Sequence, residues 1–377
     1  MFRIIHIVEN LDKGAVENWL VNIFLESKKR QPHWEWTFYC ILGEKGRLDE
    51  KVIAAGGKII YSPYWISKKY LFLKYLRQTL KSGRYDIIHS HHDYLSGFYL
   101  LATAGLSFQK RILHIHNTDK SLPVGNRRVQ KLLLGLFHKS AIYFSDLIIG
   151  ISKDTLKEFV PNKPGSKKTT VLYYGIDLTR FAVSRGKEWL REELSIPSES
   201  KIILFIGRLN ELKNPVFVID ILKEILAARQ DVYALFVGKG DKEEEVLEKA
   251  VAYKIPDSVK MAGWRSDGPD IMKAADVFVF PRIEYPKEGL GLVVVEAQAA
   301  GIPMVLSRGI VEDAIEIREL VRVVPLDNNA DEWANCINSL LDTQPAIEQG
   351  IAYKRMQESK FSLANGTTRL MELYAEA

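Results

Sequence analysis

The chain has 377 residues, of which 47% are hydrophobic and 26% are charged, and its formal net charge is +5. Because single hydrophobic cores stop growing at about 250–300 residues, this length indicates two domains. The apolar fraction is that of a globular protein and excludes disordered, collagen-like and fibrous repeat proteins. The charge is unevenly divided: residues 1–185 carry 29 Lys and Arg against 15 Asp and Glu, whereas the remainder carries 23 against 32.

Cys40 and Cys336 are the only cysteines, and they lie far apart in sequence. They support neither a disulfide scaffold nor a cysteine-ligated metal site, so the reducing cytoplasm is the expected location. The apolar start is too short for a signal peptide, and the longest uncharged stretch, Tyr94–Gln109, is too short for a membrane span. We expect a cytoplasmic protein that attaches at most peripherally to the inner face of the membrane.

Short runs rich in Ile, Val and Phe alternate with longer amphipathic segments along the chain. In the first half these runs predict strands at Phe2–Val8, Thr37–Leu42, Lys58–Tyr61, Ile87–His89, Arg111–Ile115, Leu147–Gly150 and Thr170–Leu172. Helices are expected between them at Ala15–Lys29, Lys69–Lys81 and Arg127–Phe144. In the second half strands are predicted at Lys201–Ile206, Val232–Val237, Val259–Met261, Val277–Phe280, Met304–Leu306 and Val321–Val324. The alternation favours two doubly wound, mostly parallel α/β domains that face a cleft, with ligands at the carboxyl ends of the strands.

Between the two series lies Phe181–Ser200, a polar and charged segment in which we place the domain boundary. The expected domains are residues 1–182 and residues 183–360. Two helices, Ala346–Ser359 and Leu363–Ala375, end the chain, and the last, at about 361–377, is expected to pack back on the first domain.

The segment from Glu288 to Pro303 carries the strongest chemical signal. Two glycines, Gly289 and Gly291, precede an apolar run, so backbone N–H groups at a helix start can approach a polar ligand. The run from 292 to 300 is apolar except for Glu296 and Gln298, which predicts a buried helix. A carboxylate in such a helix needs partners, and ligand hydroxyls can supply them, although an isolated pair of glutamates would more often be structural.

A second signal follows the strand that ends at Gly207. Arg208 and Lys213 lie in the loop and first turn after it, where cations are unfavourable unless an anion is near. An Arg fork also matches phosphate geometry. Gly238 and Gly240 form another turn after a strand, but a complete dinucleotide fingerprint and a P-loop are absent, which argues against nicotinamide and ATP sites.

Histidines cluster as His89, His91 and His92 and as His114 and His116. We weighed metal binding and favour a structural role for the first three, because no acidic cluster is close in sequence. His116, at the carboxyl end of a strand, is placed to face the cleft. No Asp-x-Asp occurs, so no metal clamp for a diphosphate is indicated and no cofactor is expected.

Together these motifs resemble the retaining glycosyltransferases of the GT-B fold, family 4 (group 1). The resemblance rests on Gly-Arg-Leu-x4-Lys from Gly207, on the Gly238 turn and on Glu-Gly-x-Gly-x4-Glu-Ala-x-Ala-x-Gly-x-Pro from Glu288. The loop at Gly14 and the segment Leu172–Asp177 extend it over nearly the whole chain. The stretch after Leu306 looks closest to members that build capsular or exopolysaccharides.

The resemblance implies the site residues. Arg208 and Lys213 would hold the nucleotide diphosphate of the donor, for which the resemblance implies a UDP-sugar, and would stabilise the charge that develops as the diphosphate leaves. Glu288 with the amides of Gly289, Leu290, Gly291 and Leu292 would hold the donor sugar. Further donor contacts would come from Glu296 at the ribose, Trp264 and Arg265 at the base, His116 at the sugar, and Gly14, Gly207, Gly238 and Gly240.

Two departures from the family pattern stand out. Its usual Gly-Gly is Gly14-Ala15 here, and its Asn before Gly175 is Tyr174. Retention could arise by a carboxylate nucleophile or by same-face attack guided by the leaving phosphate, and the family favours the latter.

The expected function is transfer of a sugar from a nucleotide sugar to a saccharide or lipid-linked acceptor in cell-surface polysaccharide synthesis. The alternatives are a GT-B sugar-nucleotide epimerase and a non-catalytic protein that binds polyanions through its basic half. No nucleic-acid recognition motif accompanies the scattered cations, so nucleic acid is not an expected partner. We interpret the basic surplus of the first half as an attachment to anionic lipid or to a phosphate-bearing acceptor.

Overall fold

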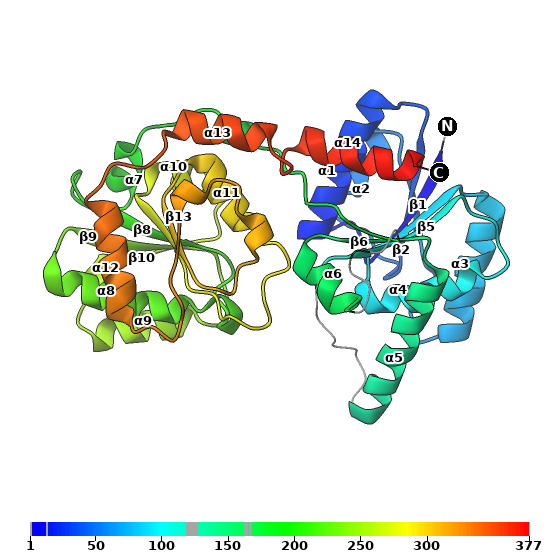
Figure 1. The fold of residues 1–377 in the computed structure, drawn as a ribbon, viewed down its shortest axis with the longest axis horizontal. Helices are drawn as coiled ribbons and strands as arrows, with labels where there is room; N and C mark the ends of the chain where they lie inside the picture. Colours follow the sequence, from blue (N-terminus) through cyan, green and yellow to red (C-terminus); the bar gives the residue numbers. More distant parts are fainter. Residues whose placement is uncertain (1, 13, 118–126, 162–164, 166–167, 377) are drawn as a thin grey trace. The chain divides into compact units, whose positions relative to one another are not determined.

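The structure is a computed structural model that describes residues 2–12, 14–117, 127–161, 165 and 168–376. The chain divides into two compact units (Figure 1). Unit 1 contains Met1–Ile176 and Lys360–Ala377, and unit 2 contains Asp177–Ser359. Unit 1 therefore takes both ends of the chain.

Unit 1 is built on seven parallel strands in the order β3-β2-β1-β4-β5-β6-β7. Their bounds are β1 (Arg3–Val8), β2 (Glu35–Cys40), β3 (Lys58–Tyr61), β4 (Ile87–Ser90), β5 (Lys110–Ile115), β6 (Leu147–Gly150) and β7 (Thr169–Val171). Each expected strand of this half is present, with bounds that differ by no more than two residues. The strand order reverses between β1 and β4, and doubly wound sheets bind ligands at this kind of switch point.

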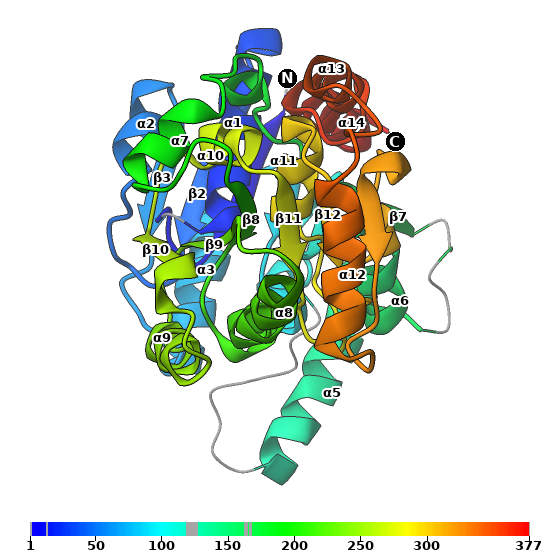
Figure 2. The same ribbon diagram turned by 90° about the vertical axis from the view of Figure 1, so that its left-hand side faces the viewer.

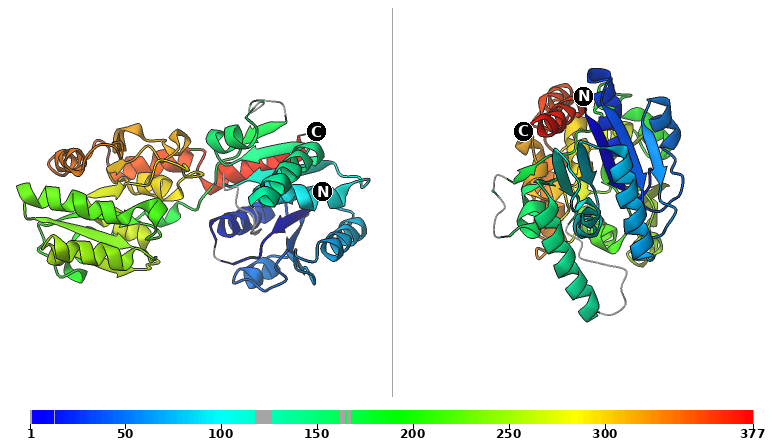
Figure 3. Two further views of the ribbon diagram at one scale, coloured as in Figure 1. Left: turned by 90° about the horizontal axis from the view of Figure 1, so that it is seen from below. Right: turned by 90° about the vertical axis from the view of Figure 1, so that its right-hand side faces the viewer.

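The helices of unit 1 cover both faces of this sheet. They are α1 (Ala15–Arg30), α2 (Asp49–Ala54), α3 (Lys69–Gly83), α4 (Ser96–Leu100), α5 (Arg127–Phe144), α6 (Lys153–Phe159) and α14 (Leu363–Ala375), with short 3₁₀ helices η1 (Asp93–Leu95) and η2 (Leu101–Thr103). The N and C marks lie close together in Figures 1 and 3, because α14 packs against α1. Helix α14 is held where Gly175 meets Gly366, whose Cβ, if present, would lie 2.8 Å from the Cα atom of Gly175.

The two faces of the unit 1 sheet differ in chemistry. On one face Ile5, Ile7 and Ile88 join a core cluster with Phe72 and Tyr99. Because side chains alternate along a strand, the neighbouring positions point the other way. On that second face lie five buried histidines, His6, His89, His91, His114 and His116, under α1 and α14.

Unit 2 is built on six parallel strands in the order β10-β9-β8-β11-β12-β13. They are β8 (Lys201–Ile206), β9 (Val232–Val237), β10 (Val259–Gly263), β11 (Val277–Phe280), β12 (Met304–Leu306) and β13 (Val321–Val323). The helices are α7 (Glu188–Glu193), α8 (Pro215–Ala228), α9 (Glu243–Ala252), α10 (Gly268–Ala274), α11 (Leu292–Ala300), α12 (Ala330–Leu341) and α13 (Gln349–Glu358), with 3₁₀ helices η3 (Thr179–Phe181), η4 (Glu211–Lys213), η5 (Pro256–Ser258), η6 (Glu312–Ala314) and η7 (Arg318–Leu320). Helix α8 packs with α9 and α12, whereas α11 packs with α10 and α13 (Figure 2). Unit 2 thus has the doubly wound architecture expected for the second half.

The segment Phe181–Ser200, in which we expected the domain boundary, lies inside unit 2. Phe181 and Arg191 are both buried, and the Arg191 guanidinium pairs with Asp276 at 2.6 Å and donates to the backbone oxygen of Ser200 at 3.1 Å. The many charged residues of this segment gave it the composition typical of an interdomain linker. The partners of residues such as Arg191 lie elsewhere in the sequence, so the composition did not reveal that the segment packs against the rest of unit 2.

Candidate functional site

The carboxyl ends of three neighbouring strands in unit 2 carry glycines in the left-handed half of conformational space. Gly207 follows β8 with φ 155°, Gly238 follows β9 with φ 135°, and Gly263 ends β10 with φ 63°. The backbones interlock, since Gly238 N–H donates to the Gly263 oxygen at 2.7 Å and Gly207 N–H donates to the Val237 oxygen at 3.0 Å. The sequence motifs around Gly207 and Gly238 therefore meet at one edge of the sheet.

Gly238 and Gly240 are required by a close contact with the neighbouring loop. A Cβ on Gly238 would lie 1.9 Å from the Gly207 oxygen, and one on Gly240 would lie 2.0 Å from the Leu209 oxygen. Those backbone oxygens cannot yield without disrupting the strand ends. The structure thus gives these two glycines a packing reason that is independent of any ligand.

Arg208 and Lys213 lie in the loop between β8 and α8. Arg208 is exposed, whereas the Lys213 side chain is largely buried, with Nζ 5.3 Å from the centroid of the Phe280 ring. The Asn210 side chain accepts a hydrogen bond from the Lys213 backbone N–H and caps η4. Helix α8 then begins with Pro215, whose fixed φ favours a helix start.

Glu288 joins these cations. Its Oε2 atom forms ion pairs with Lys213 Nζ and, at 2.6 Å, with Arg282 Nε. Burial alone would raise the pKa of the Glu288 carboxyl, but Lys213 and Arg282 outweigh it and hold the pKa below its ordinary value. Glu288 is therefore ionised, and we name Arg208, Lys213, Arg282 and Glu288 the charged cluster.

Arg282 is the member of the charged cluster that the sequence did not reveal. It lies two residues beyond the end of β11, after Pro281, and only 3% of its surface is exposed. Its Nη1 atom donates to the Ile283 oxygen at 2.7 Å, and its own carbonyl accepts from Ser307 Oγ. A cation just beyond the carboxyl end of a strand was the available signal, the same signal that identified Arg208.

The glycine motif after Glu288 leads into α11. Gly291 has φ 80° and precedes the first helical residue, Leu292, while Leu290 is only 2% exposed. Gly289 is partly exposed, and the Glu288 backbone N–H donates to the Gly309 oxygen at 2.9 Å. The amides at the start of α11 carry the partial positive charge of a helix N-terminus.

Glu296 lies in the second turn of α11, whose other faces are largely buried. Burial raises the pKa of the Glu296 carboxyl to about 7, and the opposing effect of Arg180 is smaller. No hydrogen bond to its side chain is made within the described part of the chain. A carboxyl with this environment has acceptor capacity left for a ligand.

Trp264 and Arg265 differ in their availability to a ligand. The Trp264 side chain is 68% exposed. The Arg265 guanidinium is paired with Asp267 at 2.7 Å and with Glu193. Arg265 is thus engaged in structural ion pairs, whereas the Trp264 ring is open to stacking.

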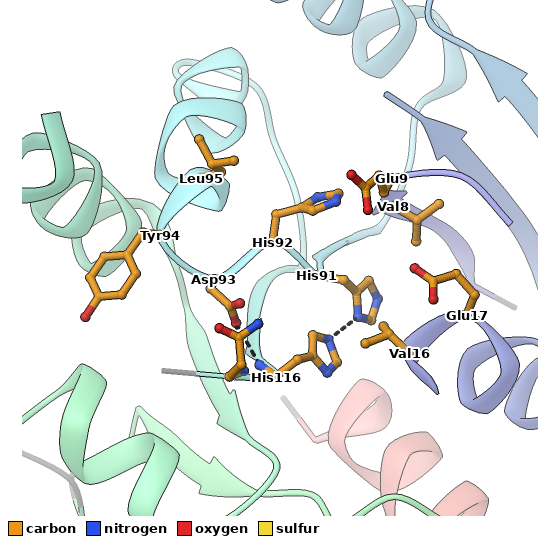
Figure 4. Close-up of a pocket in the computed structure, with 11 residues that line it drawn as sticks. Val8, Glu9, Val16, Glu17, His91, His92, Asp93, Tyr94, Leu95 and His116 are labelled. Atoms are coloured by element: carbon orange, nitrogen blue, oxygen red, sulfur yellow. Dashed lines mark hydrogen bonds between the residues drawn. The ribbon is translucent and has the colours of Figure 1, made fainter. Parts of the chain in front are cut away.

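His116 lies in unit 1, where a cavity of 360 Å³ opens beyond β1, β4 and β5 (Figure 4). Three of its lining residues are carboxylic, Glu9, Glu17 and Asp93, and among the residues that the structure describes no Lys or Arg lines it. Burial raises the pKa of Glu17 above its ordinary value. Gly14, at the start of α1, lies under Glu17, because a Cβ there would be 1.9 Å from Glu17 Oε2.

Both ring nitrogens of His116 are already hydrogen-bonded. Nδ1 contacts the Tyr174 hydroxyl, and Nε2 lies 3.0 Å from His91 Nδ1. The His116 backbone N–H donates to Asp93 Oδ1 at 2.7 Å. Tyr174, which replaces the Asn of the family pattern, thereby has a defined contact beside this cavity.

Two sets of buried histidines could supply three metal ligands each. They are His6 with His89 and His91, and His91 with His114 and His116, and in each set the ring nitrogens lie within 4.8 Å of one another. The ring nitrogens of these histidines already contact one another or tyrosine hydroxyls. The exception is His114 Nε2, which has no hydrogen-bond partner among the described residues.

Among the described residues, no helix has both the length and the apolar character needed to cross a bilayer.

Two families match the chain in series. Residues 34–180 match Glycosyltransferase Family 4, and residues 186–359 match Glycosyl transferases group 1.

Individual relatives cover most of the chain at low identity. The capsular polysaccharide biosynthesis glycosyltransferase CapH of Staphylococcus aureus is 23% identical over 386 residues, 99% of each chain. The UDP-Gal:alpha-D-GlcNAc-diphosphoundecaprenol alpha-1,3-galactosyltransferase of Escherichia coli is 25% identical over 311 residues, 80% of this chain and 78% of that one. Among solved structures, Anabaena HepE in complex with UDP is similar over 100% of both chains, with a TM-score of 0.81 and 19% identity. This likeness confirms the expected GT-B fold.

Proposed function

We propose, from the premise that the chain is a GT-B glycosyltransferase with a family 4 domain and a group 1 domain, that it transfers a sugar from a UDP-sugar to a saccharide or lipid-linked saccharide. Transfer proceeds with retention of anomeric configuration and serves cell-surface polysaccharide synthesis in the cytoplasm. The names of CapH and of the E. coli galactosyltransferase support the capsule and the lipid-linked acceptor. The complex of HepE with UDP supports uridine as the nucleoside of the donor.

The charged cluster carries this proposal. Lys213 and Arg282 pair with the ionised Glu288, and Arg208 is near enough to Lys213 to lower its pKa, so the cluster has two positive charges that its one carboxylate does not neutralise. A nucleotide diphosphate supplies negative charge of that size. As the glycosidic bond breaks, charge grows on the bridging oxygen, and fixed cations in a desolvated site stabilise it.

The remaining donor contacts follow from the same edge of the unit 2 sheet. Glu296 accepts hydrogen bonds from the two ribose hydroxyls, and the exposed Trp264 ring stacks on the base. Glu288 and the amides at the start of α11 bind hydroxyls of the donor sugar. No metal is required in this scheme, so transfer should survive EDTA.

The acceptor saccharide binds in the cavity of unit 1. Its carboxylates Glu9, Glu17 and Asp93 accept hydrogen bonds from sugar hydroxyls but repel phosphate. The phosphate-bearing part of a lipid-linked acceptor must therefore bind elsewhere in the basic half.

Helix α5 supplies the surface for that attachment. Leu132, Leu136 and Tyr143 are 65%, 53% and 80% exposed, and Lys131 and Lys139 lie on the same helix. An apolar stripe flanked by lysines fits the interface of an anionic bilayer. A Leu132→Ser/Leu136→Ser variant should lose binding to phosphatidylglycerol vesicles at low salt, and unchanged binding would refute this role for α5.

Nucleotide binding and transfer test the donor site together. UDP and UDP-sugars should raise the melting temperature, and NAD and ATP should not. Arg208→Ala and Lys213→Ala should each lower kcat by roughly 10²–10³, the loss expected for one fixed charge donor. Lys223→Ala, which removes an exposed lysine of α8, is the matched control.

The outcomes separate the competing functions. Near wild-type transfer by both variants would contradict the assignment of the cluster. A new sugar formed from UDP-sugar without any acceptor would indicate an epimerase. Inversion at the anomeric carbon of the product, measured by NMR, would contradict retention.

A further inference from the structure

The buried histidines of unit 1 form one unbranched series of contacts with two tyrosines. From the cavity inward, Tyr174 Oη contacts His116 Nδ1, and His116 Nε2 lies 3.0 Å from His91 Nδ1. His91 Nε2 lies 2.9 Å from His6 Nδ1, and His6 Nε2 lies 3.5 Å from Tyr374 Oη. Beyond this point Tyr374 Oη lies 2.7 Å from His89 Nδ1, and His89 Nε2 lies 3.2 Å from His114 Nδ1. We name these seven side chains the histidine chain.

All five histidines of the histidine chain are neutral. Burial lowers the pKa of His6 and His116 to about 3, and it lowers the pKa values of His89, His91 and His114 well below the ordinary value. A neutral imidazole donates through one nitrogen and accepts through the other. Each contact in the series therefore fixes the next tautomer, and two arrangements of protons let the Tyr374 hydroxyl donate to one neighbour and accept from the other. If Tyr374 instead accepted from both His6 and His89, its own O–H and the His114 lone pair would stay unpaired, which costs more.

The first arrangement has every histidine protonated on Nε2. Tyr174 donates to His116 Nδ1, each Nε2–H donates to the next residue, and the chain ends with the N–H of His114. In the second, every histidine is protonated on Nδ1, and His116 donates to the Tyr174 oxygen. The two arrangements differ only in which buried groups they leave without a partner.

Counting those groups decides between them. His114 Nε2 is buried and has no hydrogen-bond partner among the described residues. Tyr174 is 4% exposed, and within the described part of the chain its hydroxyl bonds only to His116. The first arrangement leaves one N–H unpaired, beside the Trp19 ring at 5.2 Å and 88°, which admits a weak N–H···π contact. The second leaves both the Tyr174 O–H and the His114 lone pair unpaired, which costs more.

We propose that Tyr174 sets the direction of this hydrogen-bond chain and thereby holds all five histidines as Nε2–H tautomers, with Tyr374 of α14 as the bridge that extends the order to His89 and His114. Tyr174 and Tyr374 are positioning residues. Because both nitrogens of His116 are occupied in the ordered chain, His116 forms a neutral wall of the cavity and is not its acid or base. Hydrogen bonding to a ligand in the cavity then falls to the other polar residues that line it, Glu9, Glu17, His92, Asp93 and Asn117.

A metal ion would use the same nitrogens and is the competing occupant. Binding at His91, His114 and His116 requires the 3.0 Å contact between His91 and His116 to break. The histidine chain consists only of histidine and tyrosine side chains, so it contains no carboxylate that could offset the charge of a divalent ion at this buried site. The proton-ordered chain satisfies the same groups without either cost.

The test is ¹⁵N NMR of the full-length protein labelled at histidine, at pH 7.5. Five histidines should show the Nε2–H pattern, with the exposed His33 as an internal reference. Tyr374→Phe should produce mixed tautomers only at His89 and His114, since their segment loses its anchor. Tyr174→Phe should produce mixed tautomers along the whole chain.

Tyr99→Phe is the matched control, because it removes a buried hydroxyl that has no hydrogen-bond partner among the described residues. It should leave all five patterns unchanged. Mixed or Nδ1–H tautomers in the wild type, or an unaltered pattern in either Tyr174→Phe or Tyr374→Phe, would overturn the proposal. Stoichiometric binding of Zn²⁺ with loss of the Nε2–H signals would overturn it as well. These readouts need no substrate, so their failure is distinct from failure of the proposed glycosyl transfer.

Discussion

The carboxyl of Glu296 should make nucleotide binding depend on pH near neutrality. Its pKa of about 7 arises because burial penalises the charged form, so half of the ligand-free molecules carry a proton there at pH 7. If the carboxylate accepts hydrogen bonds from both ribose hydroxyls, the ionised form is the one that binds. Binding then releases a proton, and affinity rises with pH.

The size of the effect follows from the fraction ionised. The apparent Kd exceeds the intrinsic value about elevenfold at pH 6 and about 1.1-fold at pH 8, so Kd should fall roughly tenfold between them. Isothermal titration calorimetry with UDP in buffers of different ionisation heat measures both Kd and the proton release. Quenching of the exposed Trp264 offers a second readout.

A variant separates this carboxyl from the ligand, whose own phosphate titrates near pH 6. Glu296→Gln keeps the shape and one acceptor but does not titrate, so it should bind more weakly at pH 8 and show only the slope due to the phosphate. A wild-type Kd with that same shallow slope would refute the reasoning. A steep slope that persists in Glu296→Gln would place the titrating group elsewhere.

Two further predictions concern the charged cluster and the acid stability of unit 1. Arg282→Ala should lower kcat by roughly 10², because Glu288 loses a partner and the diphosphate loses a cation. Arg282→Lys should restore part of this loss. Equal kcat values in the wild type and both variants would contradict this role of Arg282. Because the pKa values of His6 and His116 are about 3 in the fold and ordinary when unfolded, the unfolded chain binds protons first as pH falls below about 6.5. Each of these two histidines should then lower the free energy of unfolding by about 2 kcal/mol at pH 5. After correction for the intrinsic rate, hydrogen exchange in β1 and β4 should therefore accelerate from pH 7.5 to pH 5 more than in β8 and β9, which lie in the histidine-free segment 177–359. Equal changes in the two pairs of strands would contradict this prediction.

The fold was accessible from sequence because each strand is a compact apolar run. In both units these runs are bounded by polar or glycine-containing turns, so the strand positions and the alternation of strands with helices follow from local composition. Arg208 and Lys213 could be assigned to one edge with Gly238, because carboxyl ends of parallel strands share an edge. Glu288 was identified by its glycine motif.

Features that depend on distant partners were not accessible. Arg282 is buried only because Glu288 and Ser307 come to it from other loops, and its local sequence resembles a surface turn. The histidine chain is closed by Tyr374, which is 285 residues from His89. Gly240 could be singled out by its Gly-x-Gly turn, but its contact with the Leu209 backbone could not be foreseen.

The placement of α14 has a consequence for the order in which the protein matures on the ribosome. The histidine face of unit 1 is covered in part by α14, with Tyr374 among the covering residues, and α14 follows the whole of unit 2 in the sequence. Unit 2 is one continuous stretch, so all of its residues are synthesised before α14 is. Until α14 has been made and has docked, part of the histidine face of unit 1 stays uncovered, so the docking of α14 completes this unit.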